Sequence, residues 1–262
     1  MSTPVARYAK GLVARTWLRD GVIRTILVGP SRGLRYRVMT PFRAPIIGGW
    51  EPAAQRLMVR HVAPGSVAYD VGANIGIHTL LLSRLVGSTG RVYAFEPVPA
   101  LFGRLCENVR LNPSLAAATP VQLALDDHSG SAAFYTGHHA GAGHLAASGP
   151  QTGDRIEVST SMLDEFVYRE HHAPPNFMKI DVEGAEGNVL AGAEQVLRNA
   201  RPIVMVDLHS PDQDLAVGQS LTRAGYVAYR TGDGTRIRHL ERGWPDPEGL
   251  SGQVIAFPIR RG

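Results

Sequence analysis

From about residue 52 onward, strand-like and helix-like segments alternate regularly, and this alternation constrains the fold more than any other feature. Short β-rich runs between amphipathic helical patterns are typical of an α/β domain built on a mainly parallel sheet. We expect five strands, at 66–71, 91–95, 121–125, 177–181 and 203–208. We expect helices between them, near 53–63, 77–86, 99–111, 185–198 and 212–224.

The end of the chain departs from this rhythm. Residues 225–230 and 253–259 read as two more strands, with a polar, turn-rich insert and no helical pattern between them. Two such strands are typical of an antiparallel pair at a sheet edge. The predicted fold class is therefore α/β, with a seven-stranded, mainly parallel sheet and an antiparallel edge.

Two segments stand apart from the predicted α/β domain, which we place at 51–262. Residues 1–50 carry nine basic residues and a single acid, a net charge of +8 in a chain whose total is +4. We expect them to form an N-terminal cap with a basic amphipathic helix near 5–19, resting on the acidic body or attracting an anionic partner. Residues 136–154 are rich in Gly and Ala and too long for a plain connection, so they are a candidate lid or binding loop.

Composition excludes several classes of protein. An apolar fraction of 44% supports a buried core, and no apolar run approaches the roughly 18 residues of a membrane span. The first residues lack the apolar block of a signal peptide, so we expect a cytoplasmic protein without a membrane partner. With Cys106 as the single cysteine, neither an internal disulfide nor a cysteine-based zinc site can form.

A glycine-rich turn follows the first strand of the domain. Asp70 ends that strand, and Gly72, Asn74 and Gly76 follow in the pattern D-x-G-x-x-x-G before a helix. Glycines here permit a positive φ or a close approach, so that backbone N–H groups can face a ligand. A dinucleotide site would need glycine where Asn74 stands, which disfavours NAD.

The second strand ends in Phe-Glu-Pro, which places Glu96 where the ribose of an adenosine lies in a doubly wound sheet. A carboxylate can accept both ribose hydroxyls, and hydrogen bonds to a charged acceptor contribute about 1.5–3 kcal/mol each. Asp70 beside the loop would repel a nucleoside phosphate and favour a cationic nucleoside. S-adenosylmethionine satisfies both requirements.

Three stretches together resemble the FkbM-type family of S-adenosylmethionine-dependent methyltransferases: DVGANIG, the following FEP, and KIDVEGAEGNVLAGAEQVL. The resemblance covers roughly residues 50–210. It implies a Rossmann-like seven-stranded fold and O-methylation of hydroxyls on small natural products or sugars. It also implies that the cofactor is contacted by Asp70, Gly72, Asn74, Gly76 and Glu96.

The resemblance implies one further cofactor contact and shows one departure from the family pattern, and the position before the first helix adds a separate candidate. Adenine would lie near the end of the third strand, where Asp126 is our choice for its exocyclic amine. Glu51, just before the first helix, is a candidate partner for the methionine amino group, or else a charge at a helix N-terminus. The family commonly has E-x-H after the fifth strand, whereas this chain has Asp207, Leu208 and His209 there.

Methyl transfer to a hydroxyl needs a group that removes its proton. The fourth and fifth strand ends bring together the candidate catalytic residues Lys179, Asp181, Asp207 and His209, and strand alternation places 179 and 181 on one face. Lys179 is notable because the chain has 25 Arg and only two Lys. A buried Lys can act as a base, although an internal ion pair is equally compatible. His209 is the other candidate base, or a hydrogen-bonded loop histidine.

We weighed a divalent metal at the two strand-end acids, because two carboxylates and substrate oxygens suit Mg²⁺. Mg²⁺ is possible but not favoured, because Lys179 is positioned to neutralise Asp181 and no third acid or amide follows Asp207 directly. No metal ligands are therefore predicted. The histidines at 138–139, 144 and 171–172 are expected to be solvated.

The sequence thus predicts an O-methyltransferase that acts on a hydroxyl of a small molecule. The bias towards Arg, Ala, Gly and Pro indicates a GC-rich bacterial source, which fits secondary metabolism such as antibiotic biosynthesis. One alternative is nucleic-acid methylation, motivated by the basic N-terminus, but no Asn/Asp-Pro-Pro-aromatic motif follows the fourth strand. The other is a non-catalytic nucleotide-binding module. A homo-oligomer is left open.

Overall fold

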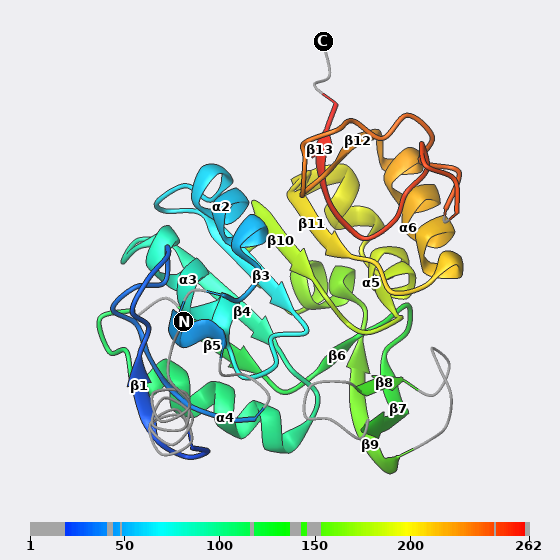
Figure 1. Ribbon diagram of the computed structural model, residues 1–262. Coiled ribbons are helices and arrows are strands. Elements are labelled where there is room, and N and C mark those ends of the chain that lie inside the picture. Colours follow the sequence, from blue (N-terminus) through cyan, green and yellow to red (C-terminus); the bar gives the residue numbers. More distant parts are fainter. Residues whose placement is uncertain are drawn as a thin grey trace, which may run out of the picture.

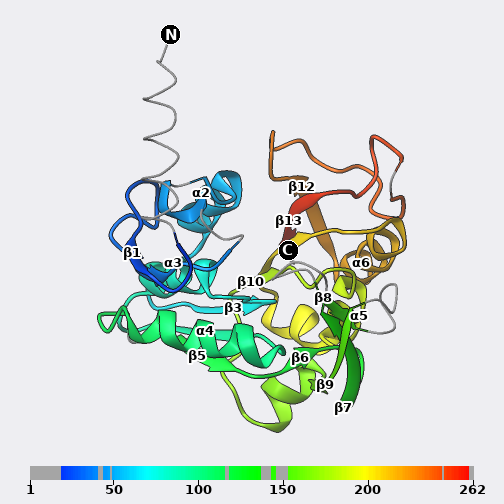
Figure 2. The same cartoon turned by 60° about the horizontal axis from the view of Figure 1, so that its bottom comes forward.

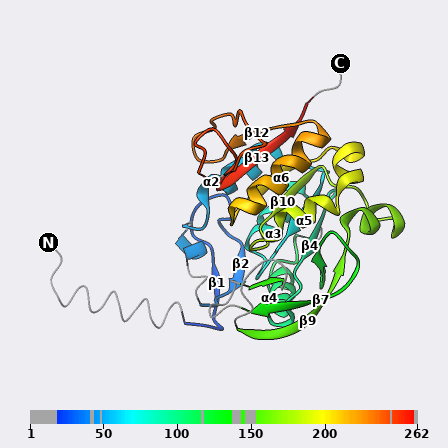
Figure 3. The ribbon, with the colours of Figure 1, turned by 90° about the vertical axis from the view of Figure 1, so that its right-hand side faces the viewer.

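One seven-stranded sheet forms the centre of the molecule (Figure 1). The computed structural model describes residues 19–40, 44–47, 49–115, 118–136, 143–145, 153–243 and 245–259. In order across the sheet, the strands are β12 (Tyr226–Arg230), β13 (Gln253–Pro258), β11 (Ile203–Asp207), β10 (Phe177–Ile180), β3 (Val67–Val71), β4 (Arg91–Phe95) and β5 (Ala118–Val121). Strands β11, β10, β3, β4 and β5 pair in parallel. Strand β13 is antiparallel to β11 and β12, so the predicted α/β fold with an antiparallel edge is confirmed (Figure 3).

Helices cover both faces of this sheet (Figure 1). They are α2 (Pro52–His61), α3 (Ile77–Val86), α4 (Pro99–Arg110), α5 (Glu186–Ala191) and α6 (Pro211–Ala224), with a 3-10 turn η1 (Ala44–Ile47) and π-helical turns η2 (Glu165–Arg169) and η3 (Val196–Ala200). Met58 of α2 and Leu81 of α3 share a buried cluster with Ala68, whereas Leu190 of α5 and Leu221 of α6 share one with Tyr69. None of the described helices combines the length and apolar character needed to span a bilayer.

The third predicted strand differs from the observed one. Instead of one strand over 121–125, β5 ends at Val121 and a separate strand, β6 (Ala124–Leu125), joins a second sheet. The Leu123 N–H donates to the Val121 carbonyl, and this tight turn redirects the chain between the two strands.

A second, four-stranded sheet of order β6-β9-β7-β8 was not predicted (Figure 2). Its other strands are β7 (Gly130–Thr136), β8 (Gly143–Leu145) and β9 (Asp154–Ser161). Part of the candidate lid at 136–154 therefore pairs with β7 as β8, while residues 137–142 and 146–152 lie outside the described residues. Phe134 and Leu145 pack against Ala185, which ties this sheet to the strand-end region.

The single helix predicted at 185–198 is interrupted at Gly192. A Cβ at this position would overlap the carbonyl oxygen of Asp126, so only glycine allows this close approach. Helix α5 ends at Ala191, and η3 resumes the helical path at Val196.

The described part of the N-terminal cap forms a two-stranded antiparallel sheet, β1 (Ile23–Thr25) and β2 (Arg35–Arg37) (Figure 3). The predicted helix near 5–19 lies outside the described residues, apart from Arg19. Tyr36 and Ile46 share one buried cluster with Ile75 and Leu80. The described cap residues therefore pack onto α3 and the glycine loop.

Asn108 of α4 connects the cap to the glycine loop. Its Oδ1 accepts a hydrogen bond from the Arg37 N–H at 2.8 Å, and its Nδ2 donates to the Ile75 carbonyl at 2.7 Å. The side chain is fully buried, so water cannot replace either bond.

We expect Asn108→Ala to lower the free energy of unfolding by about 2–4 kcal/mol, because it leaves a buried donor and a buried acceptor unpaired. Urea denaturation measures this loss. Asn199→Ala is the matched control, because Asn199 is exposed. An Asn108→Ala protein that unfolds at the wild-type urea concentration would contradict the role of Asn108 as a connector.

Candidate active site

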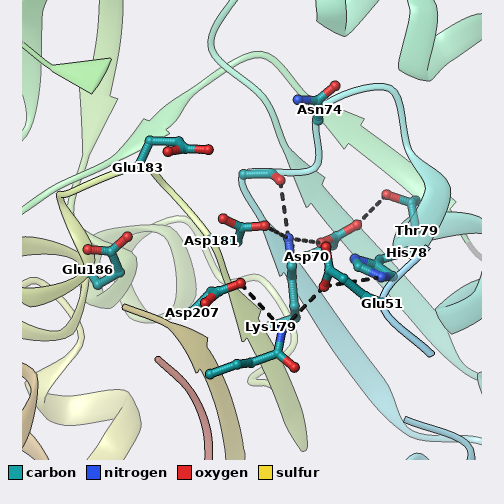
Figure 4. Close-up of polar contacts among 12 residues, drawn as sticks. Glu51, Asp70, Asn74, His78, Thr79, Lys179, Asp181, Glu183, Glu186 and Asp207 are labelled. Carbon is teal, nitrogen blue, oxygen red and sulfur yellow. Dashed lines mark hydrogen bonds and ion pairs between the residues drawn. The ribbon is translucent and has the colours of Figure 1, made fainter. Parts of the chain in front are cut away.

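Strand register brings the candidate catalytic residues together. Lys179 of β10 is the direct neighbour of Asp70 on β3 and of Met205 on β11. Neighbouring residues of paired strands point to the same face, as do residues two apart along one strand. Asp181 and Asp207 therefore lie on the same face as Lys179, the face against which α2 and α3 pack. Figure 4 shows the three side chains close together.

Lys179 is the centre of a buried ionic cluster (Figure 4). Its Nζ lies 3.0 Å from Asp181 Oδ2, 3.8 Å from Asp70 Oδ1 and 3.5 Å from the Gly72 carbonyl oxygen. Burial favours the neutral amine, but the charges of Asp181, Asp70 and Glu51 outweigh it and raise the pKa of Lys179. A lysine that stays protonated cannot accept a proton, so the geometry favours the second of the two predicted roles, an internal ion pair, over that of a base.

Asp70 lies behind the glycine loop rather than at a ligand surface. Its side chain is fully buried and accepts a hydrogen bond from Thr79 Oγ1 at 2.6 Å. Burial raises the pKa of this carboxyl, while Lys179 and Thr79 oppose the rise. Asp70 thus holds Lys179 through an ion pair and α3 through the hydrogen bond from Thr79.

Glu51 lies in the same cluster. Gln253 Nε2 donates to Glu51 Oε2 at 3.2 Å and lies 3.4 Å from Asp207 Oδ2, so it bridges the two carboxylates. Burial raises the pKa of both. His78 Nε2 lies 3.8 Å from Glu51 Oε2, but burial lowers the pKa of His78 to about 3, so this imidazole is neutral.

Both loop glycines have a positive φ, and at Gly72 close packing against backbone adds a second requirement for glycine. Gly72 has a φ of +74°, and a Cβ there would overlap the Asp181 carbonyl. Gly76 has a φ of +90°, and its Cβ would lie 2.6 Å from Leu105 Cδ1 of α4. The predicted reasons were a positive φ or close ligand approach for Gly72, and packing of the helix start against the strand for Gly76; the positive φ of Gly72 is confirmed. The observed neighbours are β10 and α4.

Glu96 is held rigidly at the other end of the loop. The Asn74 N–H donates to its Oε2 at 2.8 Å, and the Val98 N–H donates to its Oε1 at 2.9 Å. Asn74 itself has a φ of +53°, a conformation that Asn tolerates better than most residues. Burial raises the pKa of Glu96 to about 7, against the two amide hydrogen bonds.

A cavity of about 250 Å³ opens between these elements. Among the predicted site residues, Gly72, Asn74, Glu96 and Asp181 line it. The remaining walls are mainly apolar and come from both sheets and the cap, including Met39, Val98, Leu101, Leu123, Leu125, Phe134, Leu145 and Val182. Its lining therefore combines a largely apolar surface with three carboxylates, those of Glu96, Asp181 and Glu183.

Asp126 does not line the cavity, although its neighbour Leu125 does. The buried Asp126 Oδ1 accepts from Asn188 Nδ2 and from the Asp127 N–H, both at 2.9 Å. In this arrangement Asp126 fixes the chain after β6.

His209 lies beside the cavity and has a partner that the sequence reasoning missed. Its Nδ1 lies 2.7 Å from Oε1 of the buried Glu186. Its Nε2 lies 3.6 Å from both Asp181 Oδ1 and Glu183 Oε2, and those two residues line the cavity. Glu186 is the second acid of the V-E-G-A-E run, but nothing in the run indicates that it is the one turned inward.

The oxygens of Asp181 and Asp207 and a ring nitrogen of His209 lie within 4.8 Å of one another, so they could surround a cation. We do not identify them as metal ligands, because the Lys179 ammonium already balances Asp181 and Mg²⁺ prefers an all-oxygen shell. The absence of a metal site stays a prediction. Asp126, Asp127 and His128 form a second such group, in which His128 is exposed.

The other histidines divide into two sets. His138 and His139 lie outside the described residues, as does the side chain of His144. His171 is exposed, as expected, whereas the ring of His172 stacks on Phe166 with a centroid separation of 3.9 Å.

Comparison with known proteins gives the class of this site. A family model described as the methyltransferase FkbM domain matches residues 70–228. The chain is 31% identical over 203 residues to the hexuronic acid methyltransferase AglP of Haloferax volcanii, covering 75% of this chain and 80% of that protein. It is 31% identical over 196 residues to the 31-O-demethyl-FK506 methyltransferase FkbM of Streptomyces tacrolimicus, covering 63% and 74%.

A solved structure, the methyltransferase FkbM of Methylobacillus flagellatus, has a TM-score of 0.50 and 17% identity. That likeness covers 73% of this chain and 43% of the other, and it concerns the fold alone. The fold of this chain, the family model and the curated relatives together identify the class of protein as an S-adenosylmethionine-dependent methyltransferase. The chain belongs to the FkbM methyltransferase family, which confirms the resemblance found in its motifs.

We expect Lys179→Met to lower the free energy of unfolding by about 3–5 kcal/mol, because it leaves the Asp70 carboxylate buried without its counter-ion. In the variant the folded-state pKa of Asp70 lies above its unfolded value. The loss in free energy of unfolding relative to the wild type should therefore become smaller as the pH falls towards about 4, because the Asp70 carboxyl protonates. Urea denaturation at pH 5 and pH 8 measures both effects.

The double variant Asp70→Asn/Lys179→Met removes both charges and should recover part of the lost stability. If the double variant is as unstable as the sum of the two single variants, Lys179 and Asp70 are not coupled.

Proposed function

We propose that the protein transfers a methyl group from S-adenosylmethionine to a hydroxyl of a neutral small molecule, with His209 as the general base. The observation that carries this proposal is the position of His209 Nε2, 3.6 Å from two carboxylates that line the cavity. A proton acceptor thus stands at the edge of the cavity that fits the methyl donor.

The cavity lining fits this cofactor. The Glu96 carboxylate can accept the two ribose hydroxyls through the lone pairs that its amide donors leave free. Val98, Leu125 and Phe134 offer apolar walls for a flat base. Asp181 and Glu183 offer negative charge for a cationic amino-acid end. When bound, S-adenosylmethionine supplies a methyl group on a sulfonium that is ready for in-line displacement.

His209 would take the hydroxyl proton on Nε2 while the oxygen keeps its electron pair. Burial lowers the pKa of His209, but Glu186, Glu183 and Asp181 outweigh that effect and raise it to about 9. The neutral, accepting form therefore grows as the pH rises towards 9. Asp207, two residues earlier, can accept a second hydroxyl of the acceptor and orient it.

The negative charge around His209 affects which acceptors can bind there. Glu51, Glu183 and Asp207 are partly exposed carboxylates, and the buried Lys179 is committed to Asp70 and Asp181. Two like charges 4 Å apart repel by about 4 kcal/mol at an effective dielectric constant of 20. A neutral polyol or macrocycle therefore fits better than an anionic sugar.

The names of the relatives support a small-molecule acceptor, and the second name supports methylation on oxygen. One is named for a hexuronic acid and the other for 31-O-demethyl-FK506. The second relative, together with 25 Arg against two Lys, supports a place in bacterial secondary metabolism. The alternative of nucleic-acid methylation is less compatible with a carboxylate-rich site, which repels phosphates.

We expect S-adenosylhomocysteine to bind about tenfold more weakly at pH 6 than at pH 8, because its ribose hydroxyls need an ionised Glu96 whose pKa is about 7. Calorimetric titration measures the affinity. Glu96→Gln should weaken binding about tenfold or more at pH 8 and remove the dependence on pH. Glu107→Gln, at a partly exposed site on α4, is the control. Unchanged binding by Glu96→Gln would show that the ribose assignment is wrong.

The function is tested by incubating the protein with methyl-labelled S-adenosylmethionine and a panel of hydroxylated polyketides, neutral sugars, uronic acids, RNA and a protein mixture. We expect a labelled methyl ether on a neutral member, and turnover that rises with pH up to about 9. His209→Asn retains a donor for Glu186 and should lower turnover at least about 100-fold while binding S-adenosylhomocysteine normally. Label on RNA or protein alone would overturn the proposal.

A further inference from the structure

Glu186, the first residue of α5, is a fully buried carboxylate to which the proposed function gives no role. Its Oε1 lies 2.7 Å from His209 Nδ1 and accepts the Gly184 N–H at 3.1 Å. Its Oε2 has no hydrogen-bond partner among the residues that the structure describes. Burying a half-satisfied carboxylate is costly, so its presence calls for an explanation.

The contact between α5 and α6 fixes this carboxylate relative to His209. A Cβ on Gly187 would lie 2.5 Å from the Ala216 Cβ, so glycine lets the two helices meet closely. The Gly187 N–H also donates to Gln213 Oε1 at 2.8 Å. Because His209 lies two residues before α6, the carboxylate and the imidazole are carried by elements that cannot separate freely.

The contact between Glu186 and His209 Nδ1 also decides which ring nitrogen of His209 carries the proton in the neutral form. An ionised carboxylate only accepts hydrogen bonds, so Nδ1 must be the donor. Nε2 is then the nitrogen with a free lone pair, and it is the one that faces Asp181 and Glu183 at the cavity.

We propose that Glu186 is a positioning residue for methyl transfer: it holds the His209 ring and its tautomer so that Nε2, facing the cavity, takes the acceptor proton. This inference rests on the proposed function, because it needs His209 as the base. In the step, the hydroxyl O–H bond breaks and its proton passes to Nε2. The oxygen's electron pair forms the new bond to the methyl carbon, and the pair of the C–S bond leaves with sulfur.

Other charges also face His209, and the test must separate them from Glu186. They are Asp181 after β10, Glu183 in the following turn and Asp207 at the end of β11. Glu186 differs from all three because it makes the shortest contact, 2.7 Å against 3.6 Å for Asp181 and Glu183, and meets the other side of the ring.

The first measurement is an NMR titration of protein with ¹⁵N-labelled histidine, without any acceptor. Above about pH 9 the neutral His209 ring of the wild type should carry its proton on Nδ1. In Glu186→Gln the pKa of His209 should fall by about one unit or more, because the buried negative charge is lost. A wild-type ring protonated on Nε2, or an unchanged pKa in Glu186→Gln, would overturn the proposal even if other variants fail to fold.

The second measurement is the pH profile of turnover. In Glu186→Gln the rise of turnover with pH should move to lower pH by the same amount as the pKa of His209. The highest turnover, reached above that rise, should fall about tenfold or more. Glu194→Gln is the matched control, since it removes a half-exposed carboxylate that contacts Arg198 and Arg223 but not His209. Loss of activity in Glu186→Gln without movement of the limb indicates only structural damage and would overturn the proposal.

The two measurements also separate this proposal from the proposed function. If His209→Asn keeps wild-type turnover, the base assignment fails, and the positioning role fails with it, whatever the titration shows. If His209→Asn is inactive but Glu186→Gln keeps the wild-type profile, the proposed function stands and the positioning role alone is wrong.

Discussion

The buried ionic cluster of Lys179 with Asp70 and Asp181 is the interaction on which the rest of the site depends. Register places Lys179 directly beside Asp70, and the two-residue repeat of β10 adds Asp181 on the same face. Each charge would be prohibitive alone in this interior, so the three must form together. Their formation fixes the end of β3 against the end of β10. That contact brings the Asp181 carbonyl so close to position 72 that only glycine can begin the loop.

Asp181 belongs to two networks at once. One carboxylate oxygen meets the Lys179 ammonium at 3.0 Å, and the other lies 3.6 Å from His209 Nε2 beside the cavity. Burial raises its pKa, but Lys179 outweighs burial and holds the pKa below the usual range, so this acid is ionised at neutral pH. The same pair that secures the sheet therefore supplies a negative charge next to the ring of His209. Structure and proposed chemistry share one residue, and substitutions at Asp181 will mix the two effects.

Periodicity in the sequence was enough to predict the alternating elements, the antiparallel edge and the shared face of residues 179 and 181. These depend on local patterns and on strand alternation, which the order of residues records directly. Sequence reasoning missed the second sheet, because its strands are rich in Gly, Ala and polar residues and are stabilised by pairing with one another. It also missed the inward turn of Glu186, which depends on how closely α5 approaches α6. Both are consequences of tertiary packing, which a single sequence does not show.

Lys179 illustrates a pattern that the sequence left with two explanations. A lysine in a chain that otherwise uses arginine indicates that the side chain matters, and both a base and an internal ion pair were compatible with it. The geometry favours the ion pair. An ammonium is compact: it donates to Asp181 Oδ2 at 3.0 Å and to the Gly72 carbonyl at 3.5 Å, and it lies 3.8 Å from Asp70 Oδ1 as an ion pair. A guanidinium is larger and donates within one plane, so it fits less well among these three oxygens around a side chain that is only 5% exposed. Lysine is therefore favoured for its shape and its retained proton, not for losing that proton.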